Sequence, residues 1–110
     1  MLGLEPEEVD FLLSKVVLPL EAAGAEVGCF GSRATGSHHK WSDIDLLIVH
    51  DNARIRSTIS RLNEYLEDSR FPYKVDLVPE ADLAESYRGS VMAALRRLSA
   101  QHMDARDGQS

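Results

Sequence analysis

Apolar residues recur at intervals of three and four along residues 5–23, which is the spacing of one face of an amphipathic helix. Pro6 falls in the first turn, where a missing backbone donor costs nothing, and Gly24 provides a stop after the last apolar position. Pro19 lies inside the pattern. Because it removes a donor and clashes with the preceding turn, we expect a kink or a separate last turn there. The apolar face consists of Val9, Leu12, Leu13, Val16, Val17 and Leu20.

Three short apolar runs predict strands over residues 25–30, 43–50 and 73–78. The first run leads into Gly31, and the third is closed by Pro79. We expect the first two strands to be neighbours in one sheet, with the glycine turn and a polar loop between them.

Two further segments have helical spacing. Residues 51–70 have Asp51 or Asn52 available as the N-cap, and their apolar face consists of Ile55, Ile59, Leu62 and Leu66. Asp82 and Glu85 resemble a capping box that opens a last helix. The apolar face of that helix would be Leu83, Tyr87, Val91, Leu95 and Leu98, which we interpret as core rather than as an interface.

The order helix, strand, loop, strand, helix, strand, helix predicts an α+β fold in which helices pack on one face of a small mixed sheet. A chain of 110 residues suffices for one compact domain, which we assign to residues 1–103. Residues 104–110 have no apolar anchor and are expected to form a frayed tail.

Composition narrows the class of protein. The hydrophobic fraction of 44% and the charged fraction of 27% are ordinary for a soluble domain, and no apolar run reaches the roughly 20 residues of a membrane span. No segment resembles a secretion signal, so we expect a cytoplasmic location. The single cysteine, Cys29, lies in an apolar run, where a buried and inert thiol is expected.

The charge balance is acidic. A formal net charge of −6 argues against a broad nucleic-acid surface, because binding along a phosphate backbone needs a footprint of lysine and arginine. A small anionic ligand remains possible, since local donors and bound metal ions can override the average field of the molecule.

Two aspartates flank an isoleucine in the second predicted strand. Because side chains alternate along a strand, Asp43 and Asp45 share one face and Ile44 points to the other. Neighbouring ionised carboxylates repel unless a divalent cation lies between them, and Mg²⁺ prefers such oxygen ligands. Asp76 lies in the third strand, and pairing of the two strands would bring three acids to one open face, enough for two metal ions. Taken singly, each acid could also be a solvated strand residue.

A glycine turn and a basic residue precede these acids. Gly31 permits close backbone approach, Ser32 offers a hydroxyl and an amide, and Arg33 adds a cation suited to phosphate oxygens. We expect a helical turn to begin here, with exposed amides directed at an anion. At the other end of the loop, Ser42 could orient Asp43 or cap the loop.

The polar loop between these motifs contains adjacent histidines, His38 and His39. They lack the spacing of a ligand pair, and we do not assign them a metal. With Lys40 and Trp41 they could form the rim of a nucleotide pocket or lie in solvent. For Trp41, packing in the core is favoured over stacking on a base.

The combination of Gly31-Ser32, ten intervening residues and Asp43-Ile44-Asp45 resembles the signature of the DNA polymerase β-like nucleotidyltransferase superfamily. The run GSRATG followed by SDIDLLIV, with the later aspartate in VDLV, is similar to the minimal nucleotidyltransferases. Many of these are antitoxins encoded beside a HEPN-domain toxin. The resemblance covers residues 30–78 and implies the polymerase β-like fold.

The resemblance implies how a nucleoside triphosphate would be held. Gly31 and Ser32 would hold the β- and γ-phosphates. Arg33 and Ser42 are assigned as further nucleotide contacts. The family often has a second basic residue where this chain has Thr35.

The resemblance also implies the metal ligands and the reaction. Asp43 and Asp45 would ligate two Mg²⁺ ions, and Asp76 would ligate the catalytic ion and help to deprotonate the attacking hydroxyl. That hydroxyl would attack the α-phosphorus in line, and pyrophosphate would leave. In the antitoxin branch, the resemblance implies AMP transfer from ATP to a tyrosine of the HEPN toxin, which blocks its ribonuclease activity.

Two other functions stay open. The chain could be a catalytically idle antitoxin that only binds and masks a partner. It could also transfer a nucleotide to a small molecule such as an aminoglycoside, although larger relatives use an additional domain to bind that acceptor. RNA tailing is disfavoured by the acidic composition.

Overall fold

The computed structural model describes residues 2–100, which form an α+β fold as predicted. The residues beyond 100, including the expected tail over 104–110 and the last residues of the expected domain, lie outside the described part. In chain order the elements are α1 (Pro6–Leu12), the π-helical turn η1 (Leu13–Val17), α2 (Leu18–Ala22), β1 (Glu26–Phe30), α3 (Ser32–Thr35), β2 (Ile44–Val49), α4 (Ala53–Asp68), β3 (Val75–Pro79), the 3₁₀ turn η2 (Glu80–Asp82), α5 (Glu85–Ala94) and β4 (Arg96–Leu98).

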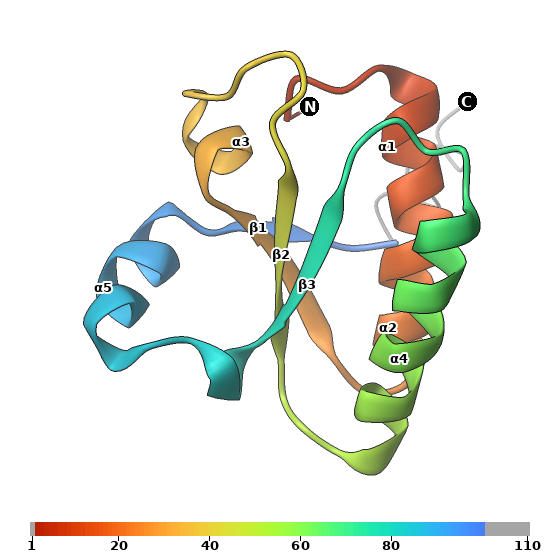
Figure 1. Ribbon diagram of the computed structural model, residues 1–110. Helices are drawn as coiled ribbons and strands as arrows, with labels where there is room; N and C mark the ends of the chain where they lie inside the picture. The colour runs from red at the N-terminus through yellow and green to blue at the C-terminus, as the bar shows by residue number, and fades with distance from the viewer. Residues whose placement is uncertain (1, 101–110) are drawn as a thin grey trace, which may run out of the picture.

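The four strands form one mixed sheet in the order β3-β2-β1-β4 (Figure 1). β1 pairs antiparallel with β2 on one side and with β4 on the other. β2 pairs parallel with β3, and α4 makes the crossover that a parallel pair requires. The predicted mixed sheet and the neighbouring first two strands are therefore confirmed.

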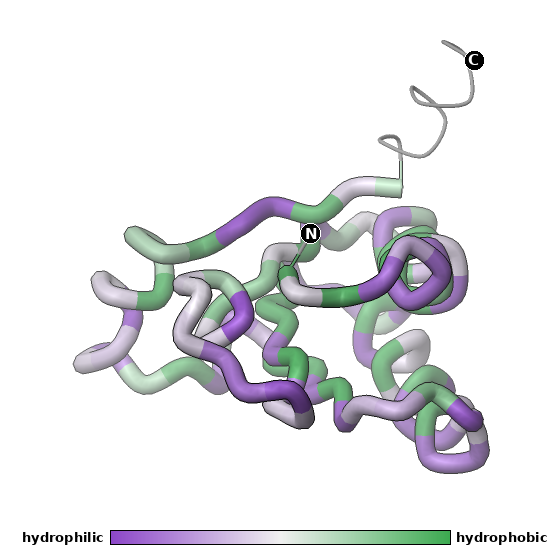
Figure 2. Tube along the Cα trace, turned by 90° about the horizontal axis from the view of Figure 1, so that it is seen from above, coloured by the Kyte–Doolittle hydropathy of each residue, from purple (hydrophilic) through white to green (hydrophobic). Residues whose placement is uncertain are grey.

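The core lies between one face of this sheet and the helices α1, α2 and α4, which gather along one side of it in Figure 1. Seen from above, the hydrophobic positions of these helices turn toward the sheet and the hydrophilic positions face outward (Figure 2). Strand residues of the core face are completely buried, and they are Cys29, Ile44, Leu46 and Ile48. Within residues 2–100, none of the helices combines the length and apolar character that crossing a bilayer requires.

At Pro19 the structure has the separate last turn that was one of the two expected outcomes, the short helix α2. The helix widens into the π-helical turn η1 just before the proline, and the amide of Leu18 donates to the carbonyl of Leu13, five residues back. The wider turn accommodates the missing donor and the ring of Pro19, so that the helix continues to Ala22. Gly24 then leaves the helix with a φ of 103°, as its position as a stop predicted.

The last predicted helix is partly wrong. Asp82 ends a 3₁₀ turn instead of capping a helix, and α5 begins after Ala84 with no side-chain cap. None of the residues of α5 is buried, and Tyr87 is 63% exposed. Leu98 belongs to β4, where pairing with β1 buries it. The apolar spacing of this segment fits a helix, but the free sheet edge of β1 offers backbone partners that a continued helix would leave unpaired.

Asn52 is the N-cap of α4. Its side-chain oxygen accepts a hydrogen bond from the amide of Ile55 at 2.8 Å, and its side-chain nitrogen donates to the carbonyl of Ala23 at 3.2 Å. Asp51, the other predicted candidate, instead pairs with Arg56 at the surface, with 2.6 Å between Oδ1 and Nη1. Asn52 therefore joins the start of α4 to the end of the first helical segment.

We expect Asn52→Ala to lower the free energy of unfolding by about 1 kcal/mol, because an amide in the first turn of α4 loses its partner. The matched control is Asp51→Ala, which removes only an exposed ion pair and should cost roughly 0.5 kcal/mol or less. Urea unfolding followed by circular dichroism measures both. Equal losses for the two variants would contradict the assignment of the cap.

The thiol of Cys29 is fully buried on the core face of β1, as the sequence predicted. Burial, followed by the negative charge of Asp45, raises its pKa to about 11. We therefore expect no reaction with Ellman's reagent in native buffer at pH 8, where the thiol is protonated and inaccessible. One equivalent should react in denaturant, and Cys29→Ser is the blank. Rapid modification of the native protein would show that β1 opens locally.

Candidate active site

The parallel pairing of β2 and β3 brings two predicted acids together. Asp45 and Asp76 are direct partners in the register. Ile44 and Leu46 flank Asp45 along β2 and are completely buried, so the carboxylate of Asp45 lies on the opposite face, away from the core helices. A shared acidic face required the second and third predicted strands to pair, and they do.

Asp45 is electrostatically strained. Its own burial raises the pKa of this carboxyl above its ordinary value, and the negative charges of Asp76 and then of Asp43 raise it further. A side-chain hydrogen bond with Asp76 acts in the same direction, while the ammonium of Lys74 lowers the pKa. A cation placed between these carboxylates would relieve the repulsion.

The predicted phosphate turn passes close to the carboxylate of Asp45 at Gly31. Its φ of 77° is in the left-handed region, and a Cβ added at this position would lie 2.6 Å from Oδ2 of Asp45. Only glycine therefore allows this turn beside the carboxylate. The short helix α3 follows, with the amides of Ala34 and Thr35 donating to the carbonyl of Gly31 at 3.1 and 3.2 Å. The predicted helical turn is confirmed.

Residues 2–100 contain no group of three acidic, histidine or cysteine side chains that could by itself hold a metal ion. Asp45 and Asp76 interact directly, whereas Asp43 is exposed, precedes β2 and reaches Asp45 through its charge. The donor set consists of carboxylate oxygens. It fits Mg²⁺, which commonly takes one or two protein carboxylates and completes its shell with water and phosphate.

Arg33 is not where a phosphate contact would need it. Its side chain is 2% exposed, and all three of its nitrogens donate to backbone carbonyls within the protein. The predicted phosphate contact is therefore wrong in this structure. The reason is that the guanidinium, which comes from the second residue of α3, points toward the backbone carbonyls of Leu2, Lys40 and Ser42.

Ser42 caps the loop, one of its two predicted roles. Its hydroxyl oxygen accepts a hydrogen bond from the amide of His39 at 2.7 Å. Its contact with a nucleotide stays a prediction. At the other end of the loop, the hydroxyl of Thr35 lies 2.9 Å from that of Ser37, so both are engaged within the loop.

Trp41 is exposed, and the predicted packing of this ring in the core is wrong. It is 64% exposed, its ring centroid lies 5.8 Å from that of Tyr73, and Nζ of Lys40 lies 5.2 Å from its centroid. The loop that bears it joins α3 to β2, and most of its residues are exposed. The ring is accessible, two residues before Asp43.

Sequence reasoning missed a neighbour of Asp76 and a neighbour of Arg33. Nζ of Lys74 lies 3.7 Å from Oδ1 of Asp76, and Tyr73 supports the buried Arg33. Lys74 could have been found, because it is two positions from Asp76 on the same strand face. A pocket of about 340 Å³ adjoins them, between α4 and β3. Its lining residues are Asn63, Glu64, Leu66, Glu67, Tyr73, Lys74, Val75 and Asp76.

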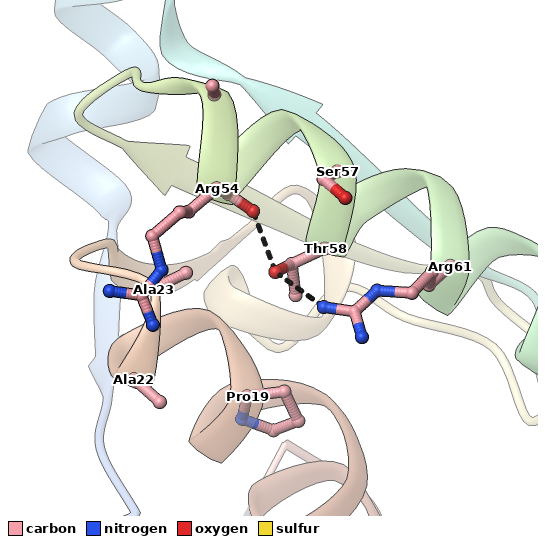
Figure 3. Close-up of a pocket in the computed structure, with 8 residues that line it drawn as sticks. Pro19, Ala22, Ala23, Arg54, Ser57, Thr58 and Arg61 are labelled. Atoms are coloured by element: carbon pink, nitrogen blue, oxygen red, sulfur yellow. Dashed lines mark hydrogen bonds between the residues drawn. The ribbon is translucent and has the colours of Figure 1, made fainter.

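A larger pocket, of about 440 Å³, lies between α2 and α4 (Figure 3). Arg61 donates to the hydroxyl of Thr58 at 3.3 Å, and that hydroxyl donates to the carbonyl of Arg54 at 2.7 Å. No carboxylate lines this pocket, and it belongs to the helical layer on the other side of the core. It is separate from the paired acids. Its lining residues are Pro19, Ala22, Ala23, Ala53, Arg54, Ser57, Thr58 and Arg61.

Comparison with known proteins agrees with this geometry. The family model described as "Nucleotidyltransferase domain" matches residues 10–98. A Haemophilus influenzae protein described as "Probable protein adenylyltransferase MntA" is 31% identical over 85 residues, which are 77% of this chain and 75% of that protein. A solved structure of a minimal nucleotidyltransferase superposes with a TM-score of 0.63 at 29% identity, covering 86% of this chain and 95% of that chain.

A solved toxin–antitoxin structure with AMP-PNP is also similar. It superposes with a TM-score of 0.49 at 21% identity, covering 93% of this chain and 79% of that chain. A similarity this distant carries no argument about ligand or partner.

We expect Asp76→Asn to raise the melting temperature of the metal-free protein at pH 7 by a few degrees, because it removes a charge that repels Asp45. Since the pKa of Asp45 is raised in the folded state, its destabilising ionisation sets in as pH rises above the ordinary carboxyl pKa of about 3.9. The gain should therefore vanish in acid. Added MgCl₂ should stabilise the wild type more than the variant.

Differential scanning fluorimetry with and without MgCl₂ measures these shifts. Asp82→Asn, which removes an exposed carboxylate of η2, beyond the opposite end of β3 from Asp76, is the matched control and should change neither value. A lower melting temperature for Asp76→Asn at pH 7 without metal would contradict the repulsion.

Proposed function

This chain belongs to the nucleotidyltransferase domain family and is a nucleotidyltransferase, and from this premise we propose that it transfers AMP from ATP to a hydroxyl group of a partner protein. The observation that carries the proposal is the in-register pair Asp45 and Asp76, with the Gly31 turn against Asp45. The Haemophilus influenzae relative is described as a protein adenylyltransferase, which supports AMP as the transferred group and a protein as the acceptor.

We assign Mg²⁺ to Asp45 and Asp76, with Asp43 as a flanking ligand. Bound there, Mg²⁺ would supply positive charge to neutralise the triphosphate and the charge that develops at the α-phosphate. Asp45 fits this role because its burial and the negative charges of Asp76 and Asp43 raise its pKa, so that its ionised state is costly without a cation. With Asp43 included, the donor set suffices for the two ions expected from the sequence.

The chain's own residues would position the reacting groups. The backbone of Gly31 and the amide and hydroxyl of Ser32 would bind the β- and γ-phosphates, because this turn lies beside Asp45. The acceptor oxygen would form a bond to the α-phosphorus while the bond from that phosphorus to the bridging oxygen breaks, and pyrophosphate would leave toward Gly31. Asp76 would accept the proton of the attacking hydroxyl.

The proposed acceptor is a tyrosine of a HEPN-domain toxin, so that the enzyme acts as an antitoxin in the cytoplasm. This assignment is supported by the resemblance of the motif residues and by a relative described as a probable protein adenylyltransferase. A masking antitoxin without catalysis would not need two repelling carboxylates on one face. An aminoglycoside-like acceptor would need a site for a small polycation, and its labelling is tested alongside.

The test combines the protein, α-³²P-labelled ATP, MgCl₂ and the protein encoded by the adjacent gene, and a parallel reaction contains an aminoglycoside. We expect label on a tyrosine of that protein, identified by mass spectrometry, and loss of its ribonuclease activity. Asp45→Asn and Asp76→Asn should each lower the rate of labelling by about 100-fold or more, because each removes a proposed metal ligand. EDTA should abolish labelling.

Asp82→Asn is the matched control and should label at the wild-type rate. Equal inhibition of the partner by wild type and both active-site variants, with no label transferred, would favour masking. Label found on an aminoglycoside but on no protein would favour the small-molecule acceptor. Either result would overturn the proposal.

A further inference from the structure

Arg33 is a buried cation that has no carboxylate partner within residues 2–100. Nε donates to the carbonyl of Ser42 at 3.0 Å, Nη1 to that of Leu2 at 3.0 Å and Nη2 to that of Lys40 at 3.2 Å. Burying a guanidinium is costly unless its donors are satisfied, and here backbone oxygens alone satisfy them. The side chain therefore ties three separate points of the backbone together.

An aromatic ring completes the surroundings of this cation. The guanidinium carbon of Arg33 lies 4.5 Å from the ring centroid of Tyr73, within the range of a cation–π contact. Tyr73 is held in turn by Phe71, whose ring lies edge-on at 5.7 Å, and by Trp41 at 5.8 Å. Arg33 thus also touches the segment that leads into β3.

Arg33 itself and two of its contacts, Ser42 and Tyr73, lie close in sequence to residues of the candidate active site. Arg33 follows the Gly31-Ser32 turn directly. It donates to the carbonyl of Ser42, the residue immediately before Asp43. Tyr73 lies three residues before Asp76. One side chain therefore connects the phosphate turn, the approach to the acidic strand β2 and the approach to β3.

We propose that Arg33 is a positioning residue for the nucleotidyl transfer, which sets the distance between the Gly31-Ser32 turn and the acids. This inference rests on the proposed function. Of the ten residues between the two motifs, residues 36–42 lie outside α3 and β2, and a loop of that length has many conformations unless its carbonyls are held. Arg33 holds two of them, at Lys40 and Ser42, and anchors them to Leu2.

Lysine cannot replace this side chain. It offers one nitrogen on a flexible stem, whereas the planar guanidinium presents five donors in a fixed fork, three of whose nitrogens are used here. In Arg33→Lys the charge is retained, but at least one carbonyl loses its partner. The effect of the variant therefore reports hydrogen-bond geometry rather than charge.

The first readout is amide hydrogen exchange in the protein without nucleotide or metal. The amide of His39, which donates to the hydroxyl of Ser42, reports the loop. We expect its exchange to become about tenfold faster or more in Arg33→Lys, because the carbonyl bonds that fix the loop are lost. Arg56→Gln, which removes an exposed arginine of an ion pair with Asp51, should leave this amide unchanged.

The second readout is the affinity for Mg²⁺–ATP, measured by titration calorimetry. We expect a loss of about 10- to 100-fold in Arg33→Lys, as for residues that orient metal ligands. Leu62→Ala removes a buried side chain of α4 and lowers the melting temperature, but it should leave this affinity within about twofold, since Leu62 lies in the core beside the first helical segment and not on the open face of the sheet. A loss of affinity in Arg33→Lys but not in Leu62→Ala therefore reports positioning of the site and not lower stability alone.

Arg33→Ala adds a rescue experiment. Methylguanidinium should restore slow exchange at His39 and binding of Mg²⁺–ATP, whereas methylammonium should restore neither, because only the former reproduces the fork of donors. Unchanged exchange and affinity in Arg33→Lys, or an equal loss of affinity in Leu62→Ala, would overturn the inference. If the wild type itself fails to bind Mg²⁺–ATP, the proposed function fails, and exchange at His39 still decides whether Arg33 holds the loop.

Discussion

The parallel pairing of β2 with β3 holds two like charges side by side on the face of the sheet that the core helices leave uncovered. Attraction between the site residues cannot explain this, because the carboxylates of Asp45 and Asp76 repel each other. The register is set from the opposite face, where Ile44 and Leu46 are completely buried. A slip of one residue would turn these apolar side chains outward and an acid inward. Hydrophobic burial therefore stabilises an arrangement that is electrostatically unfavourable until a cation binds.

At the Gly31 end of the candidate site, too, the geometry is fixed by groups other than the side chains that would bind the substrate. Gly31 places backbone against Asp45, and Arg33 holds the following loop through carbonyl groups rather than through other side chains. The loop sequence can thus vary while its path stays fixed, because every residue presents a carbonyl. The two halves of the site are connected by interactions that a sequence motif does not display.

The helices and strands of the core could be predicted because their apolar periodicity coincides with the faces that are buried. Strand alternation alone predicted on which face of the sheet the side chains of Asp45 and Asp76 lie. The fate of Leu98 could not be predicted, since its strand pairs with β1, far away in sequence, while its local spacing also suits a helix. The places of Arg33 and Trp41 depended on where the polar loop runs. Residue type suggested a ligand contact for Arg33 and core packing for Trp41, but loop geometry decided otherwise.

Gly28 lies on the face of the sheet that bears Asp45, in an apolar area beside the acids. A Cβ on this glycine would meet the side chain of Leu95 at 2.7 Å, so its absence lets Leu95 lie directly on β1. Leu47, opposite Gly28 in the ladder, is completely buried although it shares a strand face with Asp45. The surface beside the acids is therefore apolar and sealed by the segment that follows α5. Local unfolding of residues 95–98 would expose an apolar surface next to a charged one, which couples the solubility of this enzyme to the order of the segment between α5 and the end of β4.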